Sequence, residues 1–322
     1  FPRGQTLHYR QKHTEWLGRA EQAQARFTRR EIRRDVRQAF LELYYQSQAT
    51  HVIEHSRQLF EQLVAITRAH YASGRVSQQD VLQAQLELSR LEDRATKISE
   101  LADVQRASLS RWIGEAAWQP VAADFPLLPQ TQSLVTLQAS LLQHPAIESA
   151  SARVEANQQM VKAAREQYKP GVDVGLEYRK RFGDNADGSD RPDMMAAMVT
   201  LDLPLFTEKR QDRRLAARQQ QTEAAMQTRE QKLREIQRLL RSDYARWQRL
   251  GEHETLYQHH LVRESSEKAE DALQSYQSGI NEFNTLMRAR INELEVRLQA
   301  MRIRVDRAKT QARLLFLQGE SQ

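Results

Sequence analysis

The sequence predicts a mainly α-helical protein made of two long antiparallel coiled-coil hairpins, with one β-hairpin between them. Only 11 glycines and 8 prolines interrupt 322 residues, so the chain must run in a few long elements. A long polar helix, a Tyr-x-x-Gly turn and a heptad helix occur in that order twice, about 205 residues apart, with turns at Tyr71–Gly74 and Tyr276–Gly279. A repeat of this length indicates a duplicated half-protein, because solenoid units run about 20–50 residues.

The first repeat covers residues 1–136 and contains a predicted helical hairpin over 5–113. It opens with the short stub Phe1-Pro2-Arg3-Gly4. Residues 5–71 then hold no proline and one glycine, and apolar residues recur at steps of three and four, which predicts one helix. At 1.5 Å per residue this helix would reach roughly 100 Å.

The second helix of this hairpin is predicted from a capped start and a regular seam. Gly74 supplies the left-handed position that ends the preceding helix, and Ser77 is placed to cap the next. Steps of three and four then alternate as in a heptad seam. The seam residues are Val81, Ala84, Leu88, Leu91, Ala95 and Ile98. Gly114 ends the helix.

A connector and two shorter helices lead into the second repeat, residues 137–322. Residues 115–132 carry Trp118 and three prolines, which favours an irregular connector on the outside. Helices are expected at Leu134–Leu142 and Pro145–Tyr168, and proline is accepted in a first helical turn.

Residues 171–206 change to a period of two and predict a β-hairpin. Val172, Val174, Leu176 and Tyr178 alternate with polar residues or glycine. Met195, Ala197, Val199, Leu201 and Leu203 alternate with Ala196, Met198, Thr200 and Asp202. The two strands are joined by Gly183–Asp193. About ten alternating residues match a tilted strand that crosses a bilayer. A surface hairpin packed on helices fits the pattern equally well, so both interpretations stay open.

The second helical hairpin is predicted over residues 208–318. It follows the stub Leu203-Pro204-Leu205-Phe206, and its first helix runs from about Glu208 to Tyr276. Its last helix has eight consecutive steps of four and three, which predicts coiled-coil packing. The positions are Met287, Ile291, Leu294, Leu298, Met301, Val305, Ala308, Ala312 and Leu315.

Composition and charge exclude several classes of function. The formal charge is +6, but basic and acidic residues alternate along the helices, as in Arg29-Arg30-Glu31, so we expect a solvated face and no nucleic-acid partner. The sequence has no cysteine, hence no disulfide, thiolate metal site or lipidated cysteine in this segment. The sequence contains no run of about 18 apolar residues, so it predicts no membrane-spanning helix.

No motif predicts an enzyme, a cofactor or a resident metal. His51-Val52-Ile53-Glu54-His55 fits one metalloprotease pattern, but it lies midway along a long helix without a third ligand. The loop at 184–190 resembles a calcium loop whose glycine is out of register. Met194, Met195 and Met198 offer soft thioether ligands, but methionine is ordinary core filler.

The two turns are the candidate functional sites. Asp80 follows Gly74 by six residues, and the second turn offers Asn281 and Glu282 next to Phe283. Plain helix-hairpin turns explain the tyrosines and glycines but not these charged and amide groups. In a ring of hairpins such groups would converge on an axis, where rings of like charge select or gate solutes.

Together these features resemble the outer-membrane factor (TolC-like) family of tripartite efflux pumps over essentially the whole chain. The most specific parts are the two Pro stubs and the turns, Tyr71-x-x-Gly74-x5-Asp80-Val81-Leu82 and Tyr276-x-x-Gly279-x3-Phe283. Tyr168-Lys169-Pro170, Tyr178-x-x-Arg181 and Arg191-Pro192-Asp193-Met194 are most similar to the heavy-metal (cobalt-zinc-cadmium and copper) branch.

The resemblance implies a homotrimer in the bacterial outer membrane with a long periplasmic extension. Its hairpins would form part of an α-barrel, and its β-hairpin would meet outer-membrane lipid as part of a β-barrel. Partners would be a periplasmic adaptor protein and an inner-membrane, proton-driven RND-type pump. The implied adaptor-docking residues are Tyr71, Gly74, Arg75, Ser77, Asp80, Val81, Leu82, Tyr276, Gly279, Ile280, Asn281 and Phe283. The implied gate is formed by Asp80, Asn281 and Glu282.

The sequence departs from the family's pattern at its start. Phe1-Pro2 corresponds to the exit of a first β-hairpin, so that hairpin, the helix before it and the signal peptide are expected to be missing. Three such chains would supply six strands, too few for a wide channel.

Two other functions compete with export of heavy-metal cations. One is a drug-efflux or type I secretion channel. The other is a structural coiled-coil protein, which leaves the alternating strands and the Pro stubs unexplained.

Overall fold

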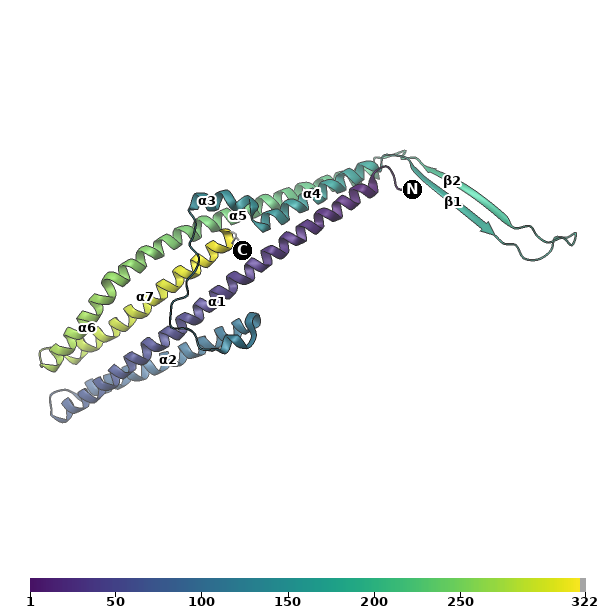
Figure 1. The fold of residues 1–322 in the computed structure, drawn as a ribbon. Coiled ribbons are helices and arrows are strands. Elements are labelled where there is room, and N and C mark those ends of the chain that lie inside the picture. The colour runs from purple at the N-terminus through teal and green to yellow at the C-terminus, as the bar shows by residue number, and fades with distance from the viewer. Residues whose placement is uncertain (319–322) are drawn as a thin grey trace. The chain divides into compact units, whose positions relative to one another are not determined.

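The computed structural model describes residues 1–318 and is mainly α-helical with one two-stranded sheet, as predicted (Figure 1). The long helices are α1 (Thr6–Ala72), α2 (Gln78–Ile113), α5 (Gln211–Leu256) and α7 (Phe283–Gln318). The shorter helices are α3 (Leu134–Ser140), α4 (Pro145–Glu166) and α6 (Val262–Gln277). The strands are β1 (Gly171–Arg179) and β2 (Met194–Asp202), and short 3₁₀ turns lie at Gly114–Trp118 and Leu141–Gln143. Among these helices, none has a stretch apolar enough to span a membrane.

The described residues form two compact units that cut across the two sequence repeats. One unit contains residues 1–28 and 141–236, and the other contains 29–140 and 237–318. The helices α1 and α5 therefore contribute to both. The division into repeats at 1–136 and 137–322 concerns the duplication in the sequence and stays a prediction.

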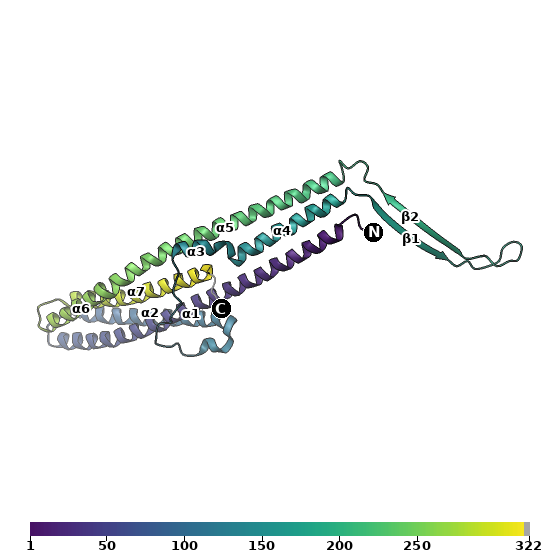
Figure 2. The same cartoon turned by 45° about the horizontal axis from the view of Figure 1, so that its top comes forward.

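In the first unit, α4 lies between the N-terminal part of α1 and the N-terminal part of α5 (Figure 2). Polar side chains connect the three helices. Arg153 on α4 donates to Glu21 on α1 at 2.7 Å, and Arg229 on α5 donates to Ser151 on α4 at 3.0 Å. Alanines on α4, with Ala156 1% exposed and Ala163 4% exposed, allow this close approach.

The β-hairpin has one apolar face, as its period of two predicts, and an opposite face that mixes Asp173, Glu177 and Thr200 with Met194, Ala196 and Met198. In the antiparallel register, Val172 lies opposite Leu201, and Val174 lies opposite Val199. Leu176–Ala197 and Tyr178–Met195 are the next pairs on the same face. This face is not covered by helices: Leu176 is 74% exposed and Val199 is 66% exposed. The interpretation as a surface hairpin packed on the helices is therefore wrong for this chain.

The second unit is held by a core to which α1, α2, α6 and α7 all contribute. Phe60 of α1, Ala84 of α2, Ala272 of α6 and Leu286 of α7 are buried in one cluster. The predicted heptad positions of α2 and α7 are all buried or half-buried. The seams between helices thus lie where the sequence pattern places them.

The connector packs along α1 and α7. The hydroxyl of Tyr44 donates to the carbonyl of Ala123 at 2.9 Å, and the ring of Phe125 meets the Tyr44 ring edge-on at 5.3 Å. The side chain of Gln311 on α7 donates to the carbonyl of Pro129 at 2.8 Å. These bonds satisfy backbone groups of a segment that has no regular structure of its own.

The second long helix differs from the prediction in two places. It begins at Gln211 rather than Glu208, because residues 207–210 make a separate turn in which Arg210 donates its backbone N–H to Thr207. It is also interrupted by a π-helical turn at Tyr257–Leu261. Here the inward-facing positions run 257, 261, 265 and 269, three successive steps of four that leave the heptad register by one residue. A π turn accommodates one extra residue, so both sides keep the same inward face.

Candidate functional site at the hairpin tips

Both helical hairpins turn with the same backbone hydrogen bonds. At the first tip, Gly74 N–H donates to the Tyr71 carbonyl and Arg75 N–H donates to the His70 carbonyl, both at 2.9 Å. At the second tip, Gly279 and Ile280 repeat the pattern at 3.1 and 2.9 Å. These are Schellman motifs, which need a left-handed residue after the helix. Gly74 with a φ of 73° and Gly279 with a φ of 75° supply it.

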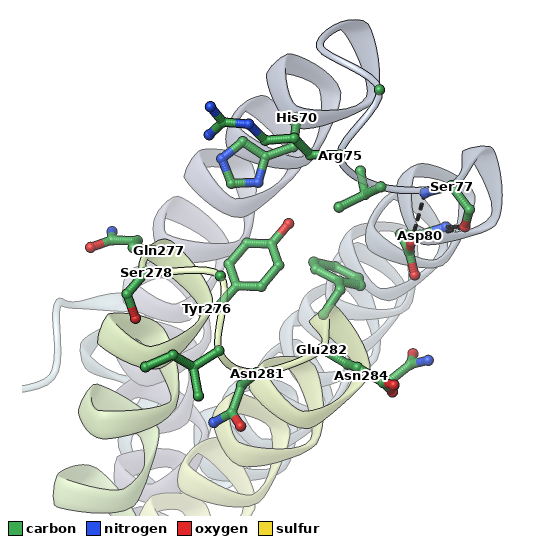
Figure 3. Close-up of a pocket in the computed structure, with 15 residues that line it drawn as sticks. His70, Arg75, Ser77, Asp80, Tyr276, Gln277, Ser278, Asn281, Glu282 and Asn284 are labelled. Carbon is green, nitrogen blue, oxygen red and sulfur yellow. Dashed lines mark hydrogen bonds between the residues drawn. The ribbon is translucent and has the colours of Figure 1, made fainter.

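The first tip is fixed by a capping box between Ser77 and Asp80. The Ser77 hydroxyl accepts from Asp80 N–H at 3.3 Å, and the Asp80 carboxylate accepts from Ser77 N–H at 3.0 Å (Figure 3). The same carboxylate oxygen accepts from the Ser77 hydroxyl at 2.8 Å. Asp80 is half-buried. Its carboxylate stabilises the N-terminus of α2 and also lies at the tip.

The second tip is built on an aromatic cluster instead. Tyr276 is 4% exposed and Phe283 is 3% exposed. Their rings meet edge-on at 5.8 Å, and the His70 ring of the first hairpin lies 5.4 Å from Tyr276. Figure 3 shows Tyr276 pointing between the two hairpins, so this side chain joins one tip to the other.

The two turn tyrosines are not equivalent, although their sequence positions are. Tyr71 is 48% exposed, whereas Tyr276 is buried. Burial raises the pKa of the Tyr276 hydroxyl, the nearby Thr67 hydroxyl opposes that rise, and the charge of Asp80 adds to it. Thr67 donates its own proton to the Leu63 carbonyl at 2.7 Å. Within residues 1–318 the Tyr276 oxygen has no hydrogen-bond partner of normal geometry.

The two tips enclose a cleft of about 710 Å³. Ten of the residues singled out from the sequence line it: Gly74, Arg75, Ser77, Asp80, Tyr276, Gly279, Ile280, Asn281, Glu282 and Phe283. Tyr71, Val81 and Leu82 do not. The lining also includes His70, Val76, Gln277, Ser278 and Asn284, which sequence reasoning missed. His70 lies four residues before Gly74, so helical spacing alone would have placed it beside the turn.

Directly behind the second tip, charged side chains join α6 to α7. The guanidinium of Arg290, 8% exposed, donates to Glu293 at 2.9 Å and to Glu270 at 3.1 Å. Arg297 donates to the other oxygen of Glu293 at 2.6 Å, and Ser266 of α6 donates to that oxygen at 3.0 Å. Buried charges of this kind are stable only as a complete network, so the second hairpin is expected to move as one body.

The candidate metal sites do not assemble. Residues 1–318 contain no group of three or more histidine, cysteine, aspartate or glutamate side chains placed to hold a metal ion. His51 and His55 are exposed on α1. In the loop between the strands, the Asp187 carboxylate instead accepts from the backbone and hydroxyl of Ser189, at 3.1 and 2.7 Å. Met195 lies on the apolar face, opposite to Met194.

A chain with two tips, two long hairpins and an uncovered β-hairpin can be compared with known families. Residues 136–320 match the model of the outer membrane efflux protein family. The chain belongs to this family. The resemblance to outer-membrane factors is thereby confirmed. The family consists of channels, which confirms that the protein is not an enzyme. The predicted location, the bacterial outer membrane with a long periplasmic extension, is also confirmed.

Solved structures share the fold at low sequence identity. A membrane protein from Pseudomonas aeruginosa is 17% identical, with a TM-score of 0.89 over 98% of this chain and 73% of that one. CusC, described as forming a transmembrane channel, is 16% identical, with a TM-score of 0.85 over 98% and 75%. The outer membrane protein VceC from Vibrio cholerae is 19% identical, with a TM-score of 0.84 over 98% and 76%. No curated protein matches this chain.

Proposed function

We propose that this protein is the outer-membrane outlet of a tripartite efflux system and passively conducts heavy-metal cations to the exterior. The observation that carries the proposal is the uncovered apolar face of the β-hairpin. Apolar side chains of this size rarely stay exposed to water over such an area. A strand of about ten residues with one apolar face fits a position facing lipid, with the opposite face toward a polar interior.

Assembly as a homotrimer is part of the proposal, and the geometry of the β-hairpin supports association of several copies. Outer membrane efflux channels are generally trimeric and work with an adaptor and an inner-membrane pump. A single hairpin leaves the outer edges of both strands unpaired. In hydrocarbon every backbone polar group must find a partner within the protein. Neighbouring copies are the partners that the proposal supplies, with the polar face of each hairpin turned to the shared interior.

The cleft between the tips is proposed as the docking surface for the hairpins of a periplasmic adaptor. Its lining combines apolar groups such as Ile280, 79% exposed, with charged and amide groups. We assign the gate to Asp80, Asn281 and Glu282. In a trimer the three copies of each residue would lie near one another at the tips. Adaptor binding would shift the population toward an open state, because it would favour the splayed tips.

Heavy-metal cations are the proposed substrate on the strength of three sequence motifs. They are Tyr168-Lys169-Pro170, Tyr178-x-x-Arg181 and Arg191-Pro192-Asp193-Met194, and the similarity to CusC supports the same branch. A drug-efflux channel is the second candidate, because the shared fold does not distinguish between the two classes of substrate. A wide conduit leaves the choice of substrate to the pump.

Complementation separates these candidates. The full-length gene is expressed with its own adaptor and pump in a bacterium that lacks the corresponding channel. We expect restored survival in zinc, cobalt or copper and none in detergents or drugs. Survival only in drugs or detergents would show that the substrate is a drug and not a heavy metal. If correctly inserted protein restores survival neither in metals nor in drugs, the export function is overturned. A variant with Val199→Arg, which places a charge on the apolar face, serves as the non-inserting control.

A further inference from the structure

Phe206, between β2 and α5, adopts a backbone conformation that suits glycine. Its φ is 59°, and within residues 1–318 it is the one non-glycine residue with a positive φ. For a bulky side chain this conformation is strained, and strain of this kind persists where the side chain has a use. The chain reaches it through a tight turn in which Leu205 N–H donates to the Leu203 carbonyl at 2.9 Å.

The first repeat meets the same requirement without strain. Counted from the prolines of the two stubs, Pro2 and Pro204, Gly4 occupies the position of Phe206 and has a φ of 49°. A Cβ at Gly4 would collide with the carboxylate of Glu166, which would have to shift, and the positive φ itself favours glycine there. At the second stub a glycine would also satisfy the backbone. The phenylalanine therefore needs a reason that lies in its side chain.

That side chain is almost fully exposed. Phe206 is 93% exposed, and Leu205 is 63% exposed. In the sequence, Leu203 and Leu205 continue the alternation of Met195, Ala197, Val199 and Leu201 beyond the end of β2 at Asp202. Strain and exposure of a phenylalanine both cost free energy in water. A contact with a group outside this chain would offset them.

We propose that Phe206, with Leu203 and Leu205, anchors the protein in the interfacial region of the inner leaflet of the outer membrane. The proposal rests on the proposed function, in which the apolar face of the β-hairpin meets lipid. Aromatic side chains favour the boundary between headgroups and acyl chains, and β-barrel proteins carry such residues at the ends of their lipid-facing strands.

The order of residues after the turn favours lipid over a second copy of this chain. After Phe206 the chain turns polar: Thr207 and the exposed Glu208 come first, and Lys209 and Arg210 follow, both exposed. Acyl chains and phosphate headgroups succeed one another in the same order along the membrane normal. Basic side chains next to an apolar anchor interact favourably with phosphates at the membrane surface.

Quenching by brominated lipid tests the anchor. The full chain with Phe206→Trp is reconstituted in phosphatidylcholine vesicles whose acyl chains are brominated near the headgroup, or near the methyl end, and compared with unbrominated vesicles. Wild type gives the background of the four native tryptophans. We expect bromine near the headgroup to remove most of the emission that Trp at 206 adds, and bromine near the methyl end to remove clearly less.

Two further variants make the result decisive. Val199→Trp reports on the strand and Leu127→Trp on the connector, where Leu127 is 95% exposed. Quenching of the strand variant without quenching at 206 would refute the anchor and leave the proposed function standing. An unquenched strand variant would refute the proposed membrane face itself, and with it the anchor. Leu127→Trp should stay unquenched, and quenching there equal to that at 206 would also refute the anchor.

Phe206→Gly provides a second measurement that does not depend on fluorescence. Because glycine relieves the strained backbone, we expect heat resistance in detergent to be unchanged or higher. Insertion into vesicles should nonetheless fall several-fold. Unchanged insertion would overturn the anchor.

Discussion

Arg94 on α2 and Glu295 on α7 form a two-point ion pair between the two helical hairpins, with N–O distances of 2.5 and 3.1 Å. Both side chains are partly exposed, at 38% and 53%. The pair lies between elements that belong to different sequence repeats. It therefore holds the two hairpins in register with each other rather than closing either one.

Breaking this pair is expected to have a small, salt-dependent effect on stability. Arg94→Ala should lower the free energy of unfolding by at most about 1 kcal/mol, because exposed ion pairs are screened by water. A double-mutant cycle with Glu295→Ala, measured by denaturant unfolding, should give a positive coupling that disappears in high salt. Strict additivity at low salt would show that the pair contributes nothing.

Asp80 is expected to act in two separable ways. Asp80→Ala removes half of the capping box and the negative charge, so it should cost up to about 1 kcal/mol of stability and raise the conductance of the closed trimer in planar bilayers. Asp80→Asn keeps an oxygen that can accept from Ser77 N–H but has no charge. A raised conductance in both variants would assign the gate to the charge. If neither changes the conductance of correctly folded protein, Asp80 is not a gate residue.

The half-buried carboxylate of Glu42 predicts a loss of stability in acid. Burial alone would raise the pKa of Glu42, but hydrogen bonds from Arg302 and Lys309, each 2.7 Å long, outweigh it and hold the pKa below its ordinary value of 4.5. A lowered pKa in the folded state means that the stabilisation is present above 4.5 and is lost as the pH falls through the folded pKa.

The measurement is the thermal midpoint of wild type and Glu42→Gln from pH 6 to pH 3. We expect the variant to be less stable at pH 6 and to show a flatter decline below 4.5, because it has no proton to bind at this position. Parallel curves for the two proteins would mean that Glu42 does not contribute to the acid sensitivity.

Two helical glycines should respond differently to alanine. Around Gly18 in α1 no atom lies within 4 Å of an added Cβ, so Gly18→Ala should stabilise the protein by about 1 kcal/mol. Around Gly251 in α5 the Cβ would lie 3.2 Å from Nε of Arg307. That guanidinium is held by Glu254 at 2.7 Å and lies over the Trp247 ring. Gly251→Ala should therefore gain less or destabilise, as measured by denaturant unfolding. Equal gains would show that Arg307 moves freely.

The two faces of β2 should tolerate charge differently. Val199 and Thr200 are neighbours on the same strand but point to opposite faces. If the apolar face meets lipid, Val199→Arg should cost about 2–4 kcal/mol of folding into vesicles near the membrane midplane. Thr200→Arg should cost much less, since it would face the polar interior. Equal costs in vesicle-folding titrations would contradict the assignment of the faces.

Much of the fold could be predicted because it depends on local patterns. The heptad steps from Met287 to Leu315 and the alternation from Val172 to Tyr178 both reappear as faces in the structure. Periodicity fixes which side of an element is apolar, whatever lies against it. The π turn at Tyr257–Leu261 was missed, because the steps of four become apparent only from burial and include the polar Ser265.

The candidate site was predicted less completely, because equal sequence positions received different neighbours. Tyr71 and Tyr276 have the same place in their turns, yet only Tyr276 has the His70 ring and Phe283 beside it. Asp80 was expected at the extreme tip, and the structure adds that its carboxylate accepts from Ser77 N–H, a contact local to the first turn. The difference between the two tyrosines arises between the hairpins, and no pattern within one hairpin contains it.

The sequence by itself determined the elements of this protein, the seams of its helices and the face of its β-hairpin that is apolar. These properties are periodic, and each is set by residues within a few positions of one another. Only the tertiary structure decided that the apolar face stays uncovered, that Tyr276 is buried between the tips, and that Phe206 holds a strained conformation. The first two depend on whether distant parts of the chain fill the space around a side chain, and the third depends on how the turn between β2 and α5 closes.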